Sequence, residues 1–114
     1  MSSKEPYCPD QFDVIWLNFD PQAGREQAGR RPAFVLSPQK YNQIARLCIL
    51  CPITTKANGY PFQCVIPDGM AIEGAIISDQ IKSLSWAERN ASFIANCPEL
   101  APEVLGKLKA LIPF

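Results

Sequence analysis

The sequence contains no histidine among its 114 residues. Histidine is a common zinc ligand and the usual partner in acid–base and nucleophile–base pairs, so the absence of histidine excludes these familiar sites. Any chemistry must instead use arginine, lysine, acidic, hydroxyl or thiol side chains. We expect no metal ion and no cofactor at the site.

Long apolar runs and an excess of charge of either sign are also missing. No apolar stretch approaches the roughly 18 residues of a membrane span, and residues 1–10 lack the apolar core of a signal peptide. Eleven basic and eleven acidic residues give a net charge of zero. Proteins that depend on non-specific duplex binding normally have a basic excess, so we expect no DNA binding by the chain itself and only a local nucleic-acid site. We also expect no membrane partner, because no membrane span is found.

The five cysteines form an odd set without a secretion signal, which is typical of a reducing cytoplasm. Two of them, Cys48 and Cys51, form a CxxC motif within an apolar run. Residues three apart in an extended strand point to opposite faces, so these two thiols cannot readily share a metal ion. We expect buried core thiols.

The length and composition, with 47% hydrophobic and 19% charged residues, indicate one domain spanning residues 1–114, with residues 1–11 as a flexible N-terminal arm. Strands are expected over residues 12–19, 32–37, 47–53, 62–66, 74–78 and 91–95, with a helical turn over 38–44. Pro52 is expected to bend or end the third strand. A final helix from Pro102 has one apolar stripe, for the core or a dimer contact. Short strands separated by glycine and proline turns indicate a mainly β, small closed barrel.

Large aromatic side chains allow two interpretations. Trp16 and Trp86 are expected to be core or interface anchors, the alternative being platforms for base stacking. Tyr60 and Phe62 lie on or just after a polar loop, where stacking against an unpaired base is a second interpretation.

An arginine-rich loop leads into the second strand within residues 24–38, GREQAGRRPAFVLSP. It contains Arg25, Glu26, Arg30 and Arg31. Because Arg31 precedes a proline, its backbone is restricted to extended geometry, and its guanidinium is a stiff, bidentate anion clamp. The alternative is a solvated loop whose arginines confer only solubility.

Strand order brings a second residue to this clamp. If the second and third strands pair in antiparallel fashion, Arg31 at the start of one meets Thr54 at the end of the other. A guanidinium beside a hydroxyl is suited to a phosphate or another oxyanion. The alternative is that Thr54 only caps the strand end.

Several motifs in this order resemble one known family. They are residues 13–16 with 19–21, 26–33, 35–38, 41–42, 52–55, 59–62 and 79–83. From about Asp13 onward, the sequence resembles the MazF branch of the MazF/PemK toxin family, the endoribonuclease halves of toxin–antitoxin pairs.

The resemblance implies an SH3-like barrel with a C-terminal helix that forms a cytoplasmic homodimer. It also implies metal-independent cleavage of single-stranded RNA at short sequences, as in an mRNA interferase, and inhibition by a cognate antitoxin with an acidic, flexible segment. By position, Arg31 and Thr54 match the catalytic arginine and threonine, and Glu26 a carboxylate nearby. Residues expected to contact RNA or support its groove are Asn18, Arg25, Gln27, Arg30, Lys56, Tyr60, Asp79, Gln80 and Lys82.

Three positions depart from the family pattern. Asn18 stands where some members have an acidic residue, and Arg30 stands where some have histidine. Ile77 replaces an arginine that the PemK branch pairs with the aspartate matching Asp79, so that version of the site is absent here.

The leading hypothesis is attack of the ribose 2′-OH on the adjacent phosphate, which leaves a 2′,3′-cyclic phosphate and a 5′-OH end. Arg31 would bind the phosphate, Thr54 would donate a hydrogen bond, and Glu26 is the candidate general base, a weak one at an ordinary pKa of about 4.3. The alternatives are a non-catalytic SH3-like binding module, a toxin that grips a protein target as CcdB does, and a family member with a silent site.

Overall fold

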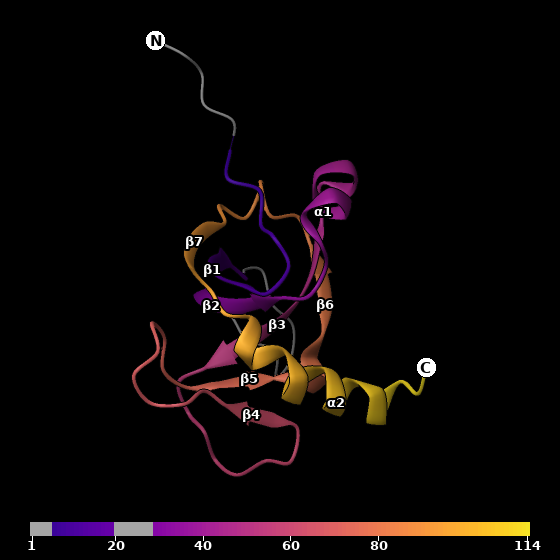
Figure 1. The fold of residues 1–114 in the computed structure, drawn as a ribbon. Helices are drawn as coiled ribbons and strands as arrows, with labels where there is room; N and C mark the ends of the chain where they lie inside the picture. Colours follow the sequence, from indigo (N-terminus) through magenta and orange to yellow (C-terminus); the bar gives the residue numbers. More distant parts are fainter. Residues whose placement is uncertain (1–5, 20–28) are drawn as a thin grey trace.

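The computed structural model describes residues 6–19 and 29–114, and its fold is drawn in Figure 1. Over these residues the chain is mainly β. The elements are β1 (Asp13–Asn18), β2 (Arg30–Val35), α1 (Gln39–Ala45), β3 (Cys48–Thr54), β4 (Gln63–Val65), β5 (Ala75–Ile77), the 3₁₀ turn η1 (Ser78–Gln80), β6 (Lys82–Leu84), β7 (Ser92–Asn96), the 3₁₀ turn η2 (Pro98–Leu100) and α2 (Ala101–Leu111).

The strands form one antiparallel sheet in the order β4-β5-β3-β2-β1-β7. The long strand β3 pairs with β2 along one edge, and along its other edge with β6 and then with β5. Among the described residues the ladder does not close between β4 and β7, so the predicted closed barrel is wrong in that respect. Side chains of α2 instead fill this region, because Val104 and Leu108 pack in one core with Cys64 of β4 and Ile94 of β7.

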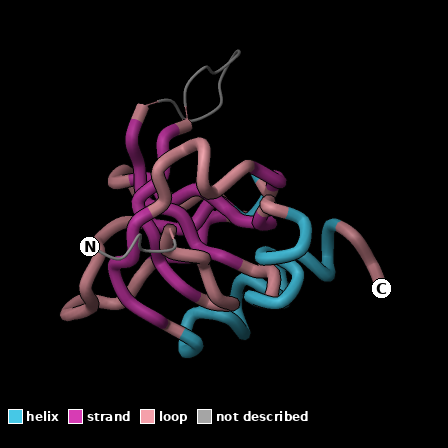
Figure 2. The backbone as a smooth tube through the Cα atoms, turned by 90° about the horizontal axis from the view of Figure 1, so that it is seen from above, coloured by secondary structure: helices cyan, strands magenta, loops and turns pink. Residues whose placement is uncertain are grey.

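Both faces of the central strands are buried. Val14 of β1 packs in the core that α2 covers, and its neighbours Ile15 and Leu17 pack in a second core with Trp86. Apolar residues on both faces of residues 12–19 predict this burial from the sequence, and the structure confirms it. Each such aliphatic side chain contributes about 1.5–3 kcal/mol by leaving water. Figure 2, seen from above, shows the strands crossing one another with the helices to one side.

The third strand does not end at Pro52, which was one of the two effects predicted for this proline. Pro52 lies opposite Ala33 of β2, and β3 runs on to Thr54. On the other edge of β3, pairing with β6 ends at Leu50 and pairing with β5 begins at Ile53. The proline thus falls where β3 changes partners, a place that tolerates a residue without an N–H.

The two tryptophans lie in different surroundings. Trp86 is 1% exposed, and its indole Nε1 donates a hydrogen bond of 2.9 Å to the Asn42 carbonyl. The expectation of a core anchor is confirmed for Trp86. Trp16 is 39% exposed on β1 and stays open to the surface.

The described part of the expected N-terminal arm, residues 6–11, is tied to the sheet and to α1. Asn42 Nδ2 donates a hydrogen bond of 2.7 Å to the Pro9 carbonyl, and Gln39 Nε2 donates one of 3.1 Å to the Cys8 carbonyl. Residues 1–5 lie outside the described residues. In the part of the chain that the structure describes, neither helix has the length and apolar character needed to cross a membrane.

The CxxC thiols lie in different cores, as the alternation of a strand predicts. Cys48 packs in the core of Trp86, and Cys51 in the core that α2 covers. Burial raises the pKa of each thiol to about 12, so both are protonated near neutral pH. Neither is available as a thiolate nucleophile or metal ligand.

Candidate active site

Three strands meet at one end of the sheet. β1 and β3 end there, and β2 begins there. The strand register places Leu17 opposite Arg31 and Ala33 opposite Pro52, so continuing the β2–β3 register past its last pair puts Arg31 opposite Thr54. The predicted antiparallel pairing of these strands is confirmed. Directly opposed residues share one face of a sheet, so Arg31 and Thr54 lie on the same face.

Thr54 is the last residue of β3, and its hydroxyl can donate a hydrogen bond to a ligand. Its Oγ1 accepts a hydrogen bond of 3.2 Å from the Lys56 backbone N–H, which caps the strand end. Among the described residues, no acceptor for the hydroxyl proton is found. Capping and ligand binding are therefore compatible, because a hydroxyl accepts and donates at the same time.

Close approach of a glycine holds the Thr54 backbone in place. A Cβ added to Gly74 would lie 2.1 Å from the Thr54 carbonyl oxygen, and the φ of Gly74 is +126°. A side chain at this position is excluded by both contacts and backbone conformation. Gly74 is the first residue of the predicted strand 74–78, and a glycine in a strand often marks such an approach.

A pocket of about 500 Å³ opens beside Thr54. It is lined by Thr54, Lys56, Asn58, Tyr60, Gln63, Ile77, Asp79 and Gln80. Five of these were predicted site residues, and the fold gathers them from the end of β3, the loop after it and η1. We call this cavity the Thr54 pocket.

Two predicted residues form the far wall of the pocket. The Tyr60 hydroxyl donates a hydrogen bond of 2.5 Å to Asp79 Oδ2. This bond raises the pKa of Tyr60 above its ordinary value of 10.0, because the carboxylate favours the protonated phenol. Tyr60 therefore stays neutral at physiological pH, with its ring 5.9 Å from that of Phe62.

Two other predicted residues point away from Arg31. The Arg30 guanidinium donates hydrogen bonds of 3.0 Å to Asn18 Oδ1 and 3.0 Å to the hydroxyl of Ser92 on β7. Because successive residues in a strand face opposite sides, Arg30 and Arg31 serve different faces. Arg30 and Asn18 thus form a separate polar cluster, to which Ser92 was not predicted to belong.

The remaining predicted residues lie outside the Thr54 pocket or outside the described residues. Lys82 opposes Leu50 on β3, and its amine lies 5.9 Å above the centre of the Phe19 ring. Arg25, Glu26 and Gln27 lie outside the described residues. Sequence reasoning missed Asn58 and Gln63 as pocket residues, since Asn58 followed by Gly59 indicates only a turn and Gln63 falls within the predicted strand 62–66.

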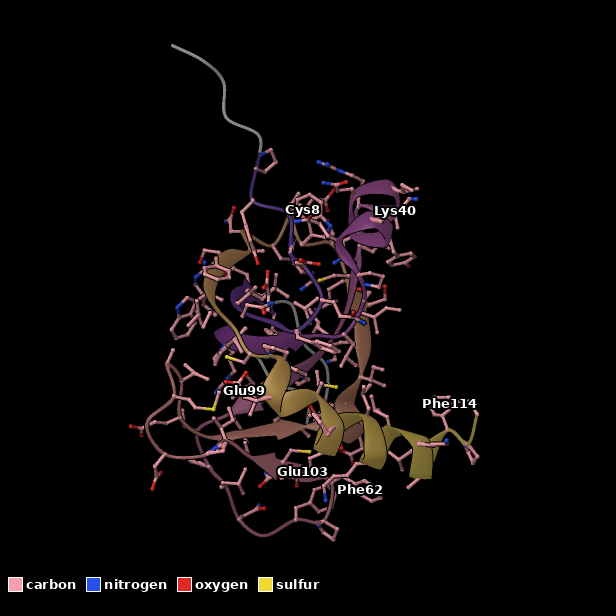
Figure 3. All side chains as sticks on the ribbon, viewed as in Figure 1. Cys8, Lys40, Phe62, Glu99, Glu103 and Phe114 are labelled. Carbon is pink, nitrogen blue, oxygen red and sulfur yellow. The ribbon has the colours of Figure 1, made fainter. Side chains whose placement is uncertain are left out.

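A second cavity, of about 550 Å³, lies near α1 at the opposite end of the molecule, where Figure 3 labels Cys8 and Lys40. Its cation, Arg46, is stacked 4.7 Å from the centre of the Trp86 ring. It contains none of the predicted site residues. The Thr54 pocket is therefore the candidate active site, because it contains the Thr54 hydroxyl and the Lys56 amine at the end of the sheet where β2 begins with Arg30 and Arg31.

The family model of the PemK-like, MazF-like toxin of type II toxin-antitoxin systems matches residues 10–112. The chain belongs to this family. The match spans all the elements that build the Thr54 pocket, and it confirms the family expected from the sequence motifs.

Individual relatives agree with the family model. Endoribonuclease toxin MazF of Escherichia coli strain K12 is 45% identical over 106 residues, 93% of this chain and 92% of the relative. The crystal structure of MazF (Form-I) from Deinococcus radiodurans superposes with a TM-score of 0.90 at 45% identity, covering 95% of this chain and 99% of that one. MazE-MazF (Form-II) from the same organism gives a TM-score of 0.84 at 46% identity, covering 93% and 96%.

Proposed function

We propose that this chain is the endoribonuclease toxin of a toxin–antitoxin system and that it cleaves single-stranded RNA in the cytoplasm. The relatives named as endoribonucleases match almost the whole chain. The observation that carries the proposal for the site is the register that sets Arg31 opposite Thr54 beside the Thr54 pocket. An arginine and a hydroxyl on one face are suited to a phosphodiester.

The ribose 2′-OH attacks the adjacent phosphorus, and the bond from phosphorus to the 5′-oxygen of the next nucleotide breaks. The products are a 2′,3′-cyclic phosphate and a 5′-OH end. Arg31 binds the non-bridging oxygens and stabilises the charge that grows on them in the transition state. Thr54 adds a neutral hydrogen bond from its hydroxyl. The leaving 5′-oxygen takes its proton from Arg31 through water.

Proton removal from the 2′-OH is assigned to Glu26. This assignment depends on the family resemblance, because Glu26 lies outside the described residues. A glutamate with an ordinary pKa of about 4.3 is ionised at neutral pH but is a weak base. Arg25 and Gln27 are assigned to RNA contacts in the same segment.

RNA sequence is read in the Thr54 pocket and in the loop after Asp20. Lys56 and Tyr60 supply a charge and an aromatic ring to the pocket, and Asp79 and Gln80 supply hydrogen-bonding groups. Unpaired bases are recognised by such combinations of stacking and edge contacts. Arg30 and Asn18 contact the RNA from the neighbouring face, and Lys82 supports the groove.

The same groove accepts an acidic, flexible segment of a cognate antitoxin, which competes with RNA for the cationic groups. The solved MazE-MazF complexes support a partner protein of this kind. The active form is a homodimer, and the reaction needs no metal ion or other cofactor.

The test is cleavage of long single-stranded RNA in the presence of a chelator. Loss of one preorganised donor typically costs about 2.7–4 kcal/mol of transition-state stabilisation, so Arg31→Ala lowers the rate at least about a hundredfold with the fold intact. Lys40→Ala is the control, since Lys40 is an exposed cation on α1 at the opposite end of the molecule (Figure 3), and it retains the wild-type rate. Near-wild-type cleavage by Arg31→Ala contradicts the site, and RNA binding without any cutting by the wild type favours a binding module.

A further inference from the structure

Gln63, the first residue of β4, holds the loop that follows Thr54. Its side-chain Oε1 accepts a hydrogen bond of 3.0 Å from the Asn58 backbone N–H, and its Nε2 donates one of 3.3 Å to the Lys56 carbonyl. Its backbone N–H donates a third, of 2.9 Å, to the Tyr60 carbonyl. One residue thus bonds to the loop backbone at three places.

The loop has few other supports. Residues 55–62 contain no helix or strand. The far part of the loop is held by the Tyr60–Asp79 bond and by Lys107 of α2, whose amine donates to the Pro61 carbonyl. Figure 3 shows the end of the loop, at Phe62, lying beneath α2 near Glu103.

In the part of the chain that the structure describes, Gln63 ties the near part of the loop to β4. Among the described residues, the backbone groups of Lys56 and Asn58 have no hydrogen-bond partner from outside residues 54–60 other than the Gln63 amide. A primary amide is suited to this task, because it accepts from an N–H and donates to a carbonyl at once. An ionised carboxylate can only accept, and an apolar side chain can do neither.

We propose that Gln63 is a positioning residue for base selection, which fixes the Lys56 and Tyr60 side chains across the pocket that receives a nucleotide next to the scissile phosphate. This inference rests on the proposed function and adds to it a residue that contacts the loop and not the reacting atoms. Base discrimination requires the reading groups to be held within fractions of an ångström. Loosening the loop therefore relaxes the choice of base more than it slows cleavage at the best sequence.

The experiment compares cut sites in one long single-stranded RNA, mapped by sequencing the new 5′-OH ends, for wild type and Gln63→Ala. Oligonucleotides carrying the best sequence and its single-base variants then give the ratio of kcat/KM between them. We expect Gln63→Ala to reduce this ratio at least about tenfold at one position, since small misplacements of binding groups have effects of this size. Gln63→Glu retains the bond from Asn58 and loses the one to Lys56, so its ratio lies between the two.

Val65→Ala is the matched control. Val65 lies on the same face of β4, is 58% exposed and makes no contact with the loop through hydrogen bonds, so its cut-site profile equals that of the wild type. An equal loss at every sequence in Gln63→Ala, or an unchanged profile, overturns the proposal. If Gln63→Ala does not fold, Gln63→Glu provides the same comparison.

Hydrogen exchange supplies a readout that does not depend on cleavage. The Asn58 amide exchanges faster in Gln63→Ala than in the wild type, whereas the Ile66 amide, which donates to the Gly74 carbonyl, keeps its rate. Faster exchange together with a relaxed profile supports the positioning role. Absence of RNA cleavage by the wild type contradicts the proposed function instead, so the two failures are told apart.

Discussion

The Tyr60 hydroxyl donates a 2.5 Å hydrogen bond to the Asp79 carboxylate and joins the loop after β3 to η1. Both residues line the Thr54 pocket, although they lie far apart in the chain. Because the proton is on the phenol, the bond exists only while Tyr60 is neutral. The state of this tyrosine therefore reports whether the pocket wall is intact.

Titration of Tyr60 is predicted to respond to its partner. The carboxylate raises the pKa of Tyr60 above 10.0 in the folded protein, so this contact is fully present below pH 10 and is lost as pH rises through the raised value. Asp79→Asn removes the negative charge, and the pKa of Tyr60 falls back toward 10. Phenolate absorbance, taken as the difference from Tyr60→Phe, measures it. The same midpoint in wild type and Asp79→Asn contradicts the bond.

Thr54 is predicted to matter through its hydroxyl and not through its methyl group. Thr54→Val retains the shape and loses the donor, so kcat falls about 10²–10³-fold, the usual cost of one oxyanion donor. Thr54→Ser retains the donor and loses less than about tenfold. Single-turnover cleavage of one oligonucleotide measures both. Equal losses in the two variants show that packing, and not the hydroxyl, is what Thr54 supplies.

The proximity of Arg31 and Thr54 could be predicted from the sequence, because strand ends and the antiparallel pairing of successive strands are local features. Two apolar runs defined the strands, and the polar residues at their ends followed. The separation of Arg30 from Arg31 onto opposite faces follows from strand alternation as well, yet charge content alone groups them together. In the structure, the hydrogen bonds of Arg30 to Asn18 and Ser92 show this division.

Other features depend on tertiary structure. Strand β6 has no apolar run, so no strand was predicted there. It forms by pairing with the edge of β3 between Cys48 and Leu50, a contact between distant parts of the chain. The path of the loop after Thr54 is set by Gln63 and by Lys107 on α2, contacts between residues distant in the chain. The absence of pairing between β4 and β7 in the described residues likewise depends on the packing of α2 against both strands.

Gly74→Ala is predicted to destabilise the fold next to Thr54. The new Cβ meets the Thr54 carbonyl at 2.1 Å, so the variant loses about 2–4 kcal/mol of unfolding free energy through overpacking and backbone strain. Gly106→Ala in α2 is the control, since nothing lies within 4 Å of its Cβ, and it gains about 0.5–1 kcal/mol. Urea denaturation measures both. Equal stability of Gly74→Ala and wild type contradicts the close approach.

Gln80 is predicted to lower the free energy of unfolding while it raises kcat/KM for RNA. Its Oε1 is buried and has no hydrogen-bond partner among the described residues, which costs about 1–3 kcal/mol. Gln80→Met removes this acceptor, so the free energy of unfolding rises by about 1 kcal/mol while kcat/KM for RNA falls. Gln39→Met is the control, because the Gln39 amide already donates to the Cys8 carbonyl, and it gains no stability. Destabilisation by Gln80→Met means that the acceptor is satisfied in solution.

Asn42 is predicted to support the fold without affecting the chemistry. It is fully buried in α1, accepts a 2.6 Å hydrogen bond from the Ser37 hydroxyl and donates to the carbonyls of Pro9 and Ser37. Asn42→Ala leaves these groups unpaired, at about 1–3 kcal/mol each, so the variant loses at least about 3 kcal/mol.

The exposed neighbour on the same helix supplies the control for this loss. Gln43→Ala changes stability by less than about 0.5 kcal/mol, as surface substitutions usually do. α1 and β4 lie at opposite ends of the molecule (Figure 1), so cleavage per folded molecule stays at the wild-type level in both variants. Thermal unfolding and RNA cleavage measured on the same preparations separate the two effects. A large fall in the cleavage rate of folded Asn42→Ala places this network in contact with the site, against the geometry described.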